Sequence, residues 1–279
     1  MKTVPIDKDN IDAAHALLVK GFPEKTASFW REGLTRVSAH HERRNLGSIG
    51  QLLMKKEEAV GVLLTLKSRL PGSERPVVNL SSWYLDPSCR WFAPRMLQLA
   101  SASADETYTD LTPSPEAATL NERLGFTTAT DVTLFYPLPL KALRPSEAAV
   151  VDMRTVPQDA FSLDITQMLE DHRRLGCILA ALRVDNSYHP LVFLKTTTKR
   201  LPSARLIYCD NRHLAQKNLG AIARFLLKHG RIAMTMPCPQ EDKNSGGFAL
   251  HKTATTQVKG EWNARLVNET YSELVLLPL

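Results

Sequence analysis

One ordered series of short markers occurs twice in this sequence, and it constrains the possible fold more than any other feature. In each half a Leu-Pro dipeptide follows a strand-like run, a second run ends at aspartate, a third stops at proline, and the half closes on Leu-Pro-Leu. The paired markers are Leu70-Pro71 and Leu201-Pro202, Asp86 and Asp210, Pro113 and Pro237, and Leu140 and Leu279. Such self-similarity predicts two copies of one structural plan, separated by loops of unequal length.

The polar stretch between the two series sets the predicted domain boundary. Residues 141–150 carry charges and one proline, which is typical of a linker. We therefore expect an N-terminal domain at 1–140, a linker at 141–150 and a C-terminal domain at 151–279. In both, strand patterns alternate with helical ones, which predicts a mixed α/β fold with a central β-sheet flanked by helices.

Hydrophobic patterns in the first half predict the element order β-α-α-β-β-β-α-β-α-β. Gly21 is expected to end the first helix, Thr26 to cap the second, and residues 55–58 to form the turn of a hairpin. Strands are expected near 77–85 and, at the equivalent place in the second half, near 204–209.

Composition narrows the class of protein. Hydrophobic residues make up 43% and charged residues 23%, as in ordinary globular domains. No apolar stretch approaches the roughly 18–20 residues of a membrane span, and the N-terminus is too polar for a secretory signal, so the cytoplasm is the expected compartment. The net charge of +6 is spread over short clusters, which argues against a nucleic-acid-binding surface. The same excess of positive charge is compatible with an anionic small ligand.

Cysteine and histidine spacing predicts no metal site. The four cysteines form no CxxC pair and are expected to be reduced, buried thiols: Cys89, Cys177, Cys209 and Cys238. His40, His41 and His172 form no spaced set with carboxylates, so surface positions are predicted for them.

Two stretches of the first half carry a resemblance to a known family. They are LSSWYLDPSCRWFAPRML at 80–97 and PEAATLNERLGF at 115–126. They resemble the two signature regions of the GNAT superfamily, the acyl-CoA-dependent N-acyltransferases. In that family the first region is a strand followed by a [QR]-x-x-G-x-[GA] loop that cradles the CoA pyrophosphate. The second usually reads N-x-x-A-x-x-L-Y-x-x-x-G-F and borders the CoA thiol. The resemblance implies two tandem GNAT-like halves, the second degenerate, because Asn211, Arg212 and His213 replace its loop without a glycine pair.

The phosphate loop departs from the family pattern. Arg90 matches its first position, but Ala93 and Arg95 replace both glycines, and Pro94 removes one backbone N–H donor. The two arginines are expected to bind phosphate through their side chains. In the alternative, the aromatic residues only pack the loop and the phosphate site is lost. The resemblance implies that acyl-CoA contacts Trp83, Tyr84, Leu85, Arg90, Trp91, Phe92, Ala93, Arg95, Ser114 and Asn121.

The catalytic groups depart from the family as well. Asn121 stands where the family has the tyrosine that protonates the leaving thiolate, and an amide cannot do this. Asp110 is the only carboxylate on the two central strands, so it is the candidate general base, with Tyr84 or Tyr108 as candidate acid. In the alternative, Asp110 only braces the turn before Pro113.

Two functions from different classes follow. The first, which the resemblance implies, is an acyltransferase that passes an acetyl or other acyl group from acyl-CoA to a small-molecule amine, without a covalent enzyme intermediate. A backbone N–H of a bulged strand near residues 83–85 would polarise the thioester carbonyl. The second is a catalytically inactive binding or regulatory protein that keeps only the fold.

Overall fold

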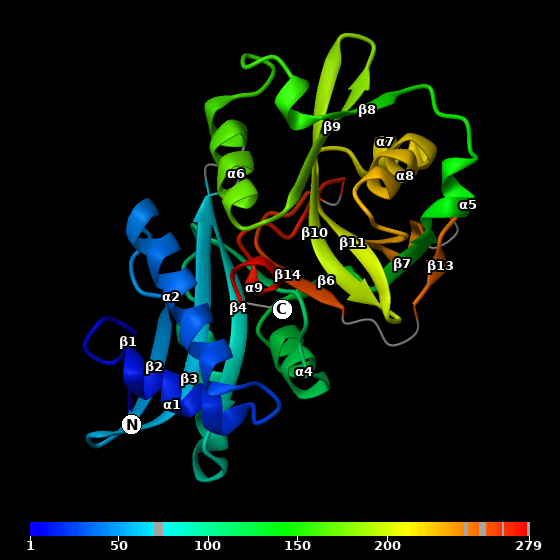
Figure 1. Cartoon of the computed structure of the whole chain (residues 1–279). Coiled ribbons are helices and arrows are strands. Elements are labelled where there is room, and N and C mark those ends of the chain that lie inside the picture. The colour runs from blue at the N-terminus through cyan, green and yellow to red at the C-terminus, as the bar shows by residue number, and fades with distance from the viewer. Residues whose placement is uncertain (70–74, 243–244, 251–254, 264, 278–279) are drawn as a thin grey trace. The chain divides into compact units, whose positions relative to one another are not determined.

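The chain is described by a computed structural model that covers residues 1–69, 75–242, 245–250, 255–263 and 265–277 (Figure 1). Three sequence markers, Leu70-Pro71, Pro278 and Leu279, lie outside the described residues. The chain divides into two compact units. The first comprises Met1–Thr127, Gln257–Glu261 and Tyr271–Leu279, and the second comprises Thr128–Thr256 and Trp262–Thr270.

The first unit is built on a mixed sheet. In spatial order the strands are β1 (Lys2–Pro5), β2 (Gly50–Lys55), β3 (Glu58–Arg69), β4 (Pro76–Leu85), β5 (Thr107–Asp110), β14 (Thr256–Lys259) and β6 (Thr127–Thr130). The predicted strand near 77–85 is therefore present as β4. Strands β4 and β5 are parallel, whereas β1–β2, β2–β3, β3–β4 and β5–β14 are antiparallel pairs.

Local sequence signals account for several boundaries in this unit. Lys55 pairs with Glu58 across the β2–β3 turn, and Lys56 takes the positive φ of 57° that such a tight turn needs. Thr26 caps the second helix, since its hydroxyl accepts a hydrogen bond from the Phe29 N–H at 3.2 Å. The helices are α1 (Ile11–Gly21), α2 (Ala27–Arg44), the 3₁₀ helix η1 (Pro87–Phe92), α3 (Ala93–Ala100), α4 (Pro115–Arg123) and α9 (Glu273–Leu276).

Helices cover both faces of the first sheet. Neighbouring residues on β4 point to opposite faces, and Trp83 packs beside Met96 of α3 whereas Tyr84 packs against Gly21 of α1. Helix α1 also contacts β3 and α2. The end of β4, with α1 on one face and α3 on the other, is the part of the fold that positions the candidate site.

The second unit is built on a second mixed sheet flanked by helices. Its strands in spatial order are β13 (Phe248–Ala249), β7 (Val132–Pro137), β12 (Ala233–Cys238), β11 (Leu201–Cys209), β10 (Ser187–Thr198), β9 (Ile178–Val184) and β8 (Ala149–Asp152), with β15 (Val267–Asn268) paired to β11. Its helices are α5 (Leu138–Ala142), η2 (Met153–Thr155), α6 (Leu163–Arg174), α7 (Arg212–Lys217), α8 (Leu219–Lys228) and η3 (Gln240–Asp242). Strand β11 includes the stretch predicted at 204–209.

The two sheets share one strand order, and each contains a strand from the other half of the sequence. In the first sheet β14 lies antiparallel beside β5, and in the second β7 lies antiparallel beside β12. The predicted ranges 1–140 and 151–279 thus each contribute a strand to the sheet that the other range mainly forms. The division into domains at these ranges stays a prediction, and the compact units differ from it by this exchange.

Buried histidines correct one sequence-based expectation. His40 and His41 lie in α2, which continues to Arg44, and they are 6% and 1% exposed rather than at the surface. His172 of α6 is fully buried, with its Nδ1 2.8 Å from the Met168 carbonyl oxygen. All four cysteines are free and buried. Within the described residues, no helix combines the length and apolar character needed to cross a bilayer.

Candidate active site

The site begins where two parallel strands separate. Strands β4 and β5 pair from Val77 and Thr107 up to Leu80 and Asp110, where β5 ends. Strand β4 continues to Leu85, so its last residues extend beyond the end of β5 and do not pair with it. Backbone polar groups and side chains at the end of β4 therefore face a gap rather than a neighbouring strand.

A β-bulge at Ser82 reshapes β4 at this point. Leu63 of β3 pairs with Trp83 and Leu64 pairs with Ser81, which leaves Ser82 without a partner on β3. Ser82 has a φ of 36°, a conformation that non-glycine residues rarely adopt. Bulges re-aim neighbouring groups, and here the bulge lies one residue before the predicted 83–85 segment.

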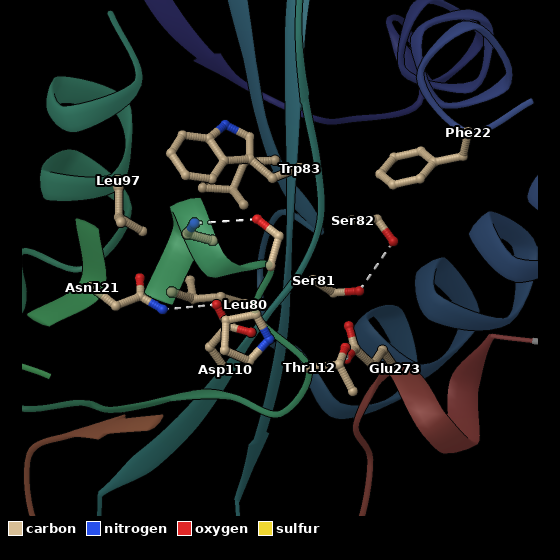
Figure 2. A pocket seen from close by; sticks show the side chains of 14 residues that line it. Phe22, Leu80, Ser81, Ser82, Trp83, Leu97, Asp110, Thr112, Asn121 and Glu273 are labelled. Atoms are coloured by element: carbon tan, nitrogen blue, oxygen red, sulfur yellow. Dashed lines mark hydrogen bonds between the residues drawn. The ribbon is translucent and has the colours of Figure 1, made fainter. Parts of the chain in front are cut away.

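A cavity of about 270 Å³ fills the gap between the separated strands (Figure 2). It is bounded by β4, by the end of β5 and by α4. Its lining residues are Phe22, Leu63, Leu80, Ser81, Ser82, Trp83, Leu97, Asp110, Thr112, Pro113, Ser114, Ala117, Asn121 and Glu273.

Asp110 is the titratable group with the most unusual environment in the cavity. Burial raises its pKa from the ordinary 3.8 to about 6, and hydrogen bonds from Asn121 and from the Thr112 N–H limit the rise. Asn121 Nδ2 donates to Asp110 Oδ2 at 2.9 Å and also to Gln257 Oε1 of β14 at 2.9 Å. The carboxylate is thus held in place and kept basic enough to accept a proton near neutral pH.

A second carboxylate, Glu273, reaches the cavity from α9. It accepts a hydrogen bond from Thr112 Oγ1 at 2.6 Å, and its backbone N–H donates to Asn79 Oδ1 at 3.0 Å. Asn79 is itself buried in β4 and donates to the Thr109 carbonyl oxygen of β5 at 3.3 Å. Asp110 and Glu273 thus place two carboxyl groups in the lining of the cavity.

The two candidate tyrosines lie outside this cavity. Tyr84 packs on α1, and its hydroxyl donates to Asp86 Oδ1 at 2.9 Å, an oxygen that also accepts from Lys20 at 2.7 Å. Burial and the bond to Asp86 raise the pKa of Tyr84. Tyr108 is buried, and its hydroxyl donates to Glu106 at 2.7 Å, back toward the start of β5. Burial raises its pKa far above the usual range. The structure therefore brings neither hydroxyl together with Asp110.

The predicted phosphate loop forms the 3₁₀ helix η1, which runs directly into α3. The Cys89 N–H donates to the Asp86 carbonyl at 2.8 Å, and the Ala93 N–H donates to the Arg90 carbonyl. With Pro94 lacking an N–H, few backbone donors are left for an anion, and positive charge comes from side chains.

Side chains of this loop are partly available to a ligand. Arg90 is exposed, Trp91 is 69% exposed, and Arg95 donates to Gln98 at 2.9 Å on the surface of α3. Phe92 and Ala93 instead pack against the buried cluster beneath α3. These residues fit a CoA pyrophosphate through arginine side chains, not through the glycine-type cradle. Of the other candidates, Ser114 caps α4 by accepting from the Ala117 N–H, and Leu85 is buried.

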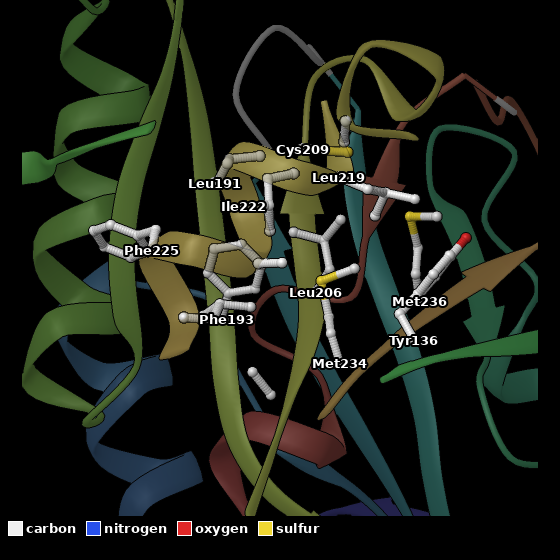
Figure 3. Close-up of a cluster of buried hydrophobic side chains, with 14 of the residues drawn as sticks. Tyr136, Leu191, Phe193, Leu206, Cys209, Leu219, Ile222, Phe225, Met234 and Met236 are labelled. Carbon is white, nitrogen blue, oxygen red and sulfur yellow. The ribbon is translucent and has the colours of Figure 1, made fainter. Parts of the chain in front are cut away.

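The equivalent gap in the second unit is filled. Beyond the parallel pairing of Arg205 with Thr235, β15 pairs with Tyr208 and Cys209 of β11. Glu269, next to β15, holds Arg205 by two contacts of 2.6 Å. Figure 3 shows Leu206, Cys209 and Met236 in the buried core here. Where the phosphate loop would stand, Arg212 is 3% exposed and pairs with Asp242 at 2.8 Å.

Three lining or supporting residues escaped sequence reasoning. Glu273 and Gln257 lie far along the chain from Asp110 and Asn121, and no local pattern links them. Ser82 is adjacent to the predicted segment, but a serine at this position does not by itself indicate a β-bulge. The adjacent serines Ser81 and Ser82, in a strand otherwise rich in apolar residues, are the one hint.

The fold resembles that of solved structures described as acetyltransferases. No protein-family model matches the sequence, and no curated protein matches it significantly. A GCN5-related N-acetyltransferase from Anabaena variabilis matches with a TM-score of 0.59 and 10% identity, covering 92% of this chain and 72% of that one. A putative acetyltransferase from Pyrococcus horikoshii matches with a TM-score of 0.55 and 14% identity, covering 99% and 95%. A GCN5-related N-acetyltransferase from Kribbella flavida matches with a TM-score of 0.56 and 10% identity, covering 92% and 70%. The chain therefore has the fold of the GCN5-related N-acetyltransferases.

Proposed function

We propose that the protein is an acyltransferase that transfers an acetyl or other acyl group from acyl-CoA to a small-molecule amine, at a single site in the first unit. The observation that carries the proposal is the cavity between the separated strands β4 and β5, with the half-buried carboxylate of Asp110, whose pKa is raised, in its wall. The solved structures of this fold described as acetyltransferases support the reaction class.

In the proposed reaction, an acyl-CoA thioester supplies the acyl group and the residues of the cavity position the acceptor. The amine nitrogen bonds to the thioester carbonyl carbon, the C–S bond breaks, and the proton lost from nitrogen passes to Asp110. A backbone N–H of β4 at the Ser82 bulge stabilises negative charge on the carbonyl oxygen. The thiolate leaves and takes its proton from solvent, because the cavity offers no tyrosine hydroxyl.

The acceptor proposed here is an amine without a carboxylate group. Asp110 and Glu273 both line the cavity. Coulomb attraction to the Asp110 carboxylate favours a protonated amine at the mouth. That amine gives one proton to solvent as it enters, and Asp110 accepts the second proton during the reaction. Phe22, Leu80 and Leu97 supply apolar walls for its carbon skeleton.

The second unit is proposed to be a degenerate copy without an acyl-CoA site. The shared strand order supports duplication, and β15 fills the gap that an acyl-CoA would need. A catalytically inactive binding or regulatory protein is the competing proposal, and the 3₁₀ turn in place of a glycine loop favours it.

Release of free CoA thiol from acetyl-CoA, measured with a panel of small primary amines, separates the two functions. An acyltransferase releases thiol only when an amine is present, and the product gains the acyl mass. Thermal stabilisation by acetyl-CoA without release for any amine would support the inactive binding protein instead.

A further inference from the structure

A second cavity, of about 440 Å³, lies wholly within the second unit and differs in charge from the first. It is bounded by the end of β8, by η2, by the end of α6, by the start of β9, by β10 and by the loop between α8 and β12. Its lining residues are Asp152, Met153, Arg154, Arg173, Cys177, Ile178, Leu179, Lys195, His229 and Arg231.

The cavity is not the relic of an acyl-CoA site. In the first unit the site lies beyond the C-terminal ends of the paired parallel strands, whereas Arg231 precedes β12 and Ile178 begins β9. This cavity therefore lies at the opposite end of the second sheet from Cys209 and Cys238, where the relic would be.

Positive charge in this lining is only partly neutralised. Asp152, the one carboxylate of the lining, is bound to Arg154 through contacts of 3.0 Å at both oxygens, and Arg173 pairs with Glu170 at 2.8 Å. Within the described part of the chain, Lys195 and Arg231 form no ion pair. Two cations facing one hollow repel each other, so an anion bound between them is stabilised.

The side chain of Arg231 is a second indication that the cavity binds an anion. Its Nε is buried from solvent and has no hydrogen-bond partner, although the backbone of the same residue is fixed by a bond to the Leu226 carbonyl at 3.0 Å. A buried N–H without an acceptor is unfavourable, and an anion in the cavity removes that penalty. His229 turns Nδ1 to the Phe225 carbonyl at 3.0 Å, so its Nε2 is the ring nitrogen left for a guest.

We propose that this cavity binds a small organic phosphate. Guanidinium and ammonium groups together are the usual donors to phosphate oxygens. Met153, Ile178 and Leu179 form an apolar wall that suits an organic portion rather than an inorganic ion alone. The volume lies within the usual range of small-molecule pockets, and the cations cluster at this one hollow, so a small ligand fits better than a polymer.

The test is a calorimetric titration of the full-length protein with pyrophosphate. Inorganic phosphate and citrate are titrated in parallel for comparison. The Lys195→Gln/Arg231→Gln variant should weaken pyrophosphate binding by at least about tenfold. Lys199→Gln/Arg200→Gln, at the exposed β10–β11 turn, removes the same charges and should change binding less than twofold. Lys195→Gln alone provides a milder change should the double variant unfold. Arg90→Glu/Arg95→Glu should leave this binding intact, which separates it from any phosphate site in the first unit.

Three results would overturn the proposal. They are no pyrophosphate binding by the wild-type protein, equal weakening in the Lys199/Arg200 control, and tighter binding of citrate than of pyrophosphate. Tighter binding of a single-stranded oligonucleotide than of pyrophosphate would assign the surface to a polymer instead.

Discussion

Asp110 combines burial with hydrogen bonds that hold its carboxylate in one orientation. Burial raises its pKa to about 6, which is close to the pH at which a general base works best. Asn121, which stands where the resemblance implies a tyrosine acid, donates to the Asp110 carboxylate at 2.9 Å. In the proposed reaction, Asn121 is therefore a positioning residue for the base.

Asp110→Asn tests the base directly. We expect kcat/KM to fall by at least about tenfold, because loss of a working general base typically slows a reaction by about 10²–10⁴-fold. The wild-type rate should rise with pH through about 6, as the carboxylate loses its proton, and the variant should lack this step. Asp105→Asn, an exposed neighbour, is the matched control. A wild-type pH profile in Asp110→Asn would remove Asp110 from the proposed reaction.

The same substitution should stabilise the protein at high pH. A folded-state pKa above the unfolded value means that stability is greatest while the acid is protonated and declines as the pH rises through about 6. A rise of the pKa from 3.8 to about 6 means that the charged form of Asp110 costs the folded state about 3 kcal/mol. Asn carries no charge, so the variant does not have this cost. In urea unfolding, the advantage of Asp110→Asn should therefore be larger at pH 8 than at pH 4. An advantage that shrinks with rising pH would show that the carboxylate is not buried as described.

At the scale of elements, the turn between β4 and α3 is where the proposed function places the CoA phosphates. The backbone donors of η1 are largely engaged within the turn, so Arg90 and Arg95 carry the positive charge. Side-chain recognition of phosphate is more sensitive to charge substitution than a backbone cradle, because the backbone donors do not change with the side chain.

Arg90→Glu/Arg95→Glu should abolish the thermal shift that acetyl-CoA produces. At about 100 times the dissociation constant, that ligand stabilises the wild-type protein by about 2.7 kcal/mol. Lys55→Glu/Lys56→Glu makes the same change of charge at the exposed β2–β3 turn and should keep the shift. An unchanged shift in the arginine variant would place the CoA phosphates elsewhere.

Gly21 is needed for contact rather than for a helix cap. Helix α1 ends at Gly21 with Phe22 as its cap, and a Cβ at Gly21 would collide with the Tyr84 ring. Gly21→Ala should therefore destabilise the protein by roughly 1–3 kcal/mol, as overpacking does. In a Tyr84→Gly background, which removes the ring and its Cβ, the same change should be neutral or stabilising, because alanine favours a helix more than glycine does. Equal effects in both backgrounds, measured by urea unfolding, would argue against the contact.

At the scale of the whole molecule, the two halves of the sequence each contribute a strand to the sheet that the other half mainly forms. Strand β14 completes the first sheet, and Gln257 on it bonds to Asn121 at 2.9 Å and to the Ala118 carbonyl at 3.2 Å. Residues 271–279 belong to the first unit as well and bring Glu273 to the cavity.

A fragment of residues 1–140 should therefore fail to fold as a native unit. It lacks β14, so β5 is left with an open edge, and Asn121 loses a buried hydrogen-bond partner. Far-ultraviolet circular dichroism and urea unfolding of the fragment should show no cooperative transition. A fragment that is monomeric and unfolds cooperatively would show that the exchange is dispensable.

The local order of elements could be predicted from sequence, whereas the exchange could not. Hydrophobic periodicity and caps such as Thr26 act over a few residues, so they predicted the first-half helices and hairpin. Asp110 was found by elimination along one strand, and the structure places it in the cavity wall. Gln257 and Glu273 meet it only through long-range packing, which no local pattern encodes. His40 and His41 were predicted at the surface because the sequence around them has weak apolar periodicity. Helix α2 nevertheless continues through both residues to Arg44.

The most direct test of the central claim is a calorimetric titration of the full-length protein with acetyl-CoA. One site in the first unit, and a second unit closed by β15, predict a stoichiometry of one acetyl-CoA per chain. The heat of binding should vanish in Arg90→Glu/Arg95→Glu and persist in Asp110→Asn. Two sites per chain, or no binding by the wild-type protein, would contradict an acyl-CoA site confined to the gap between β4 and β5.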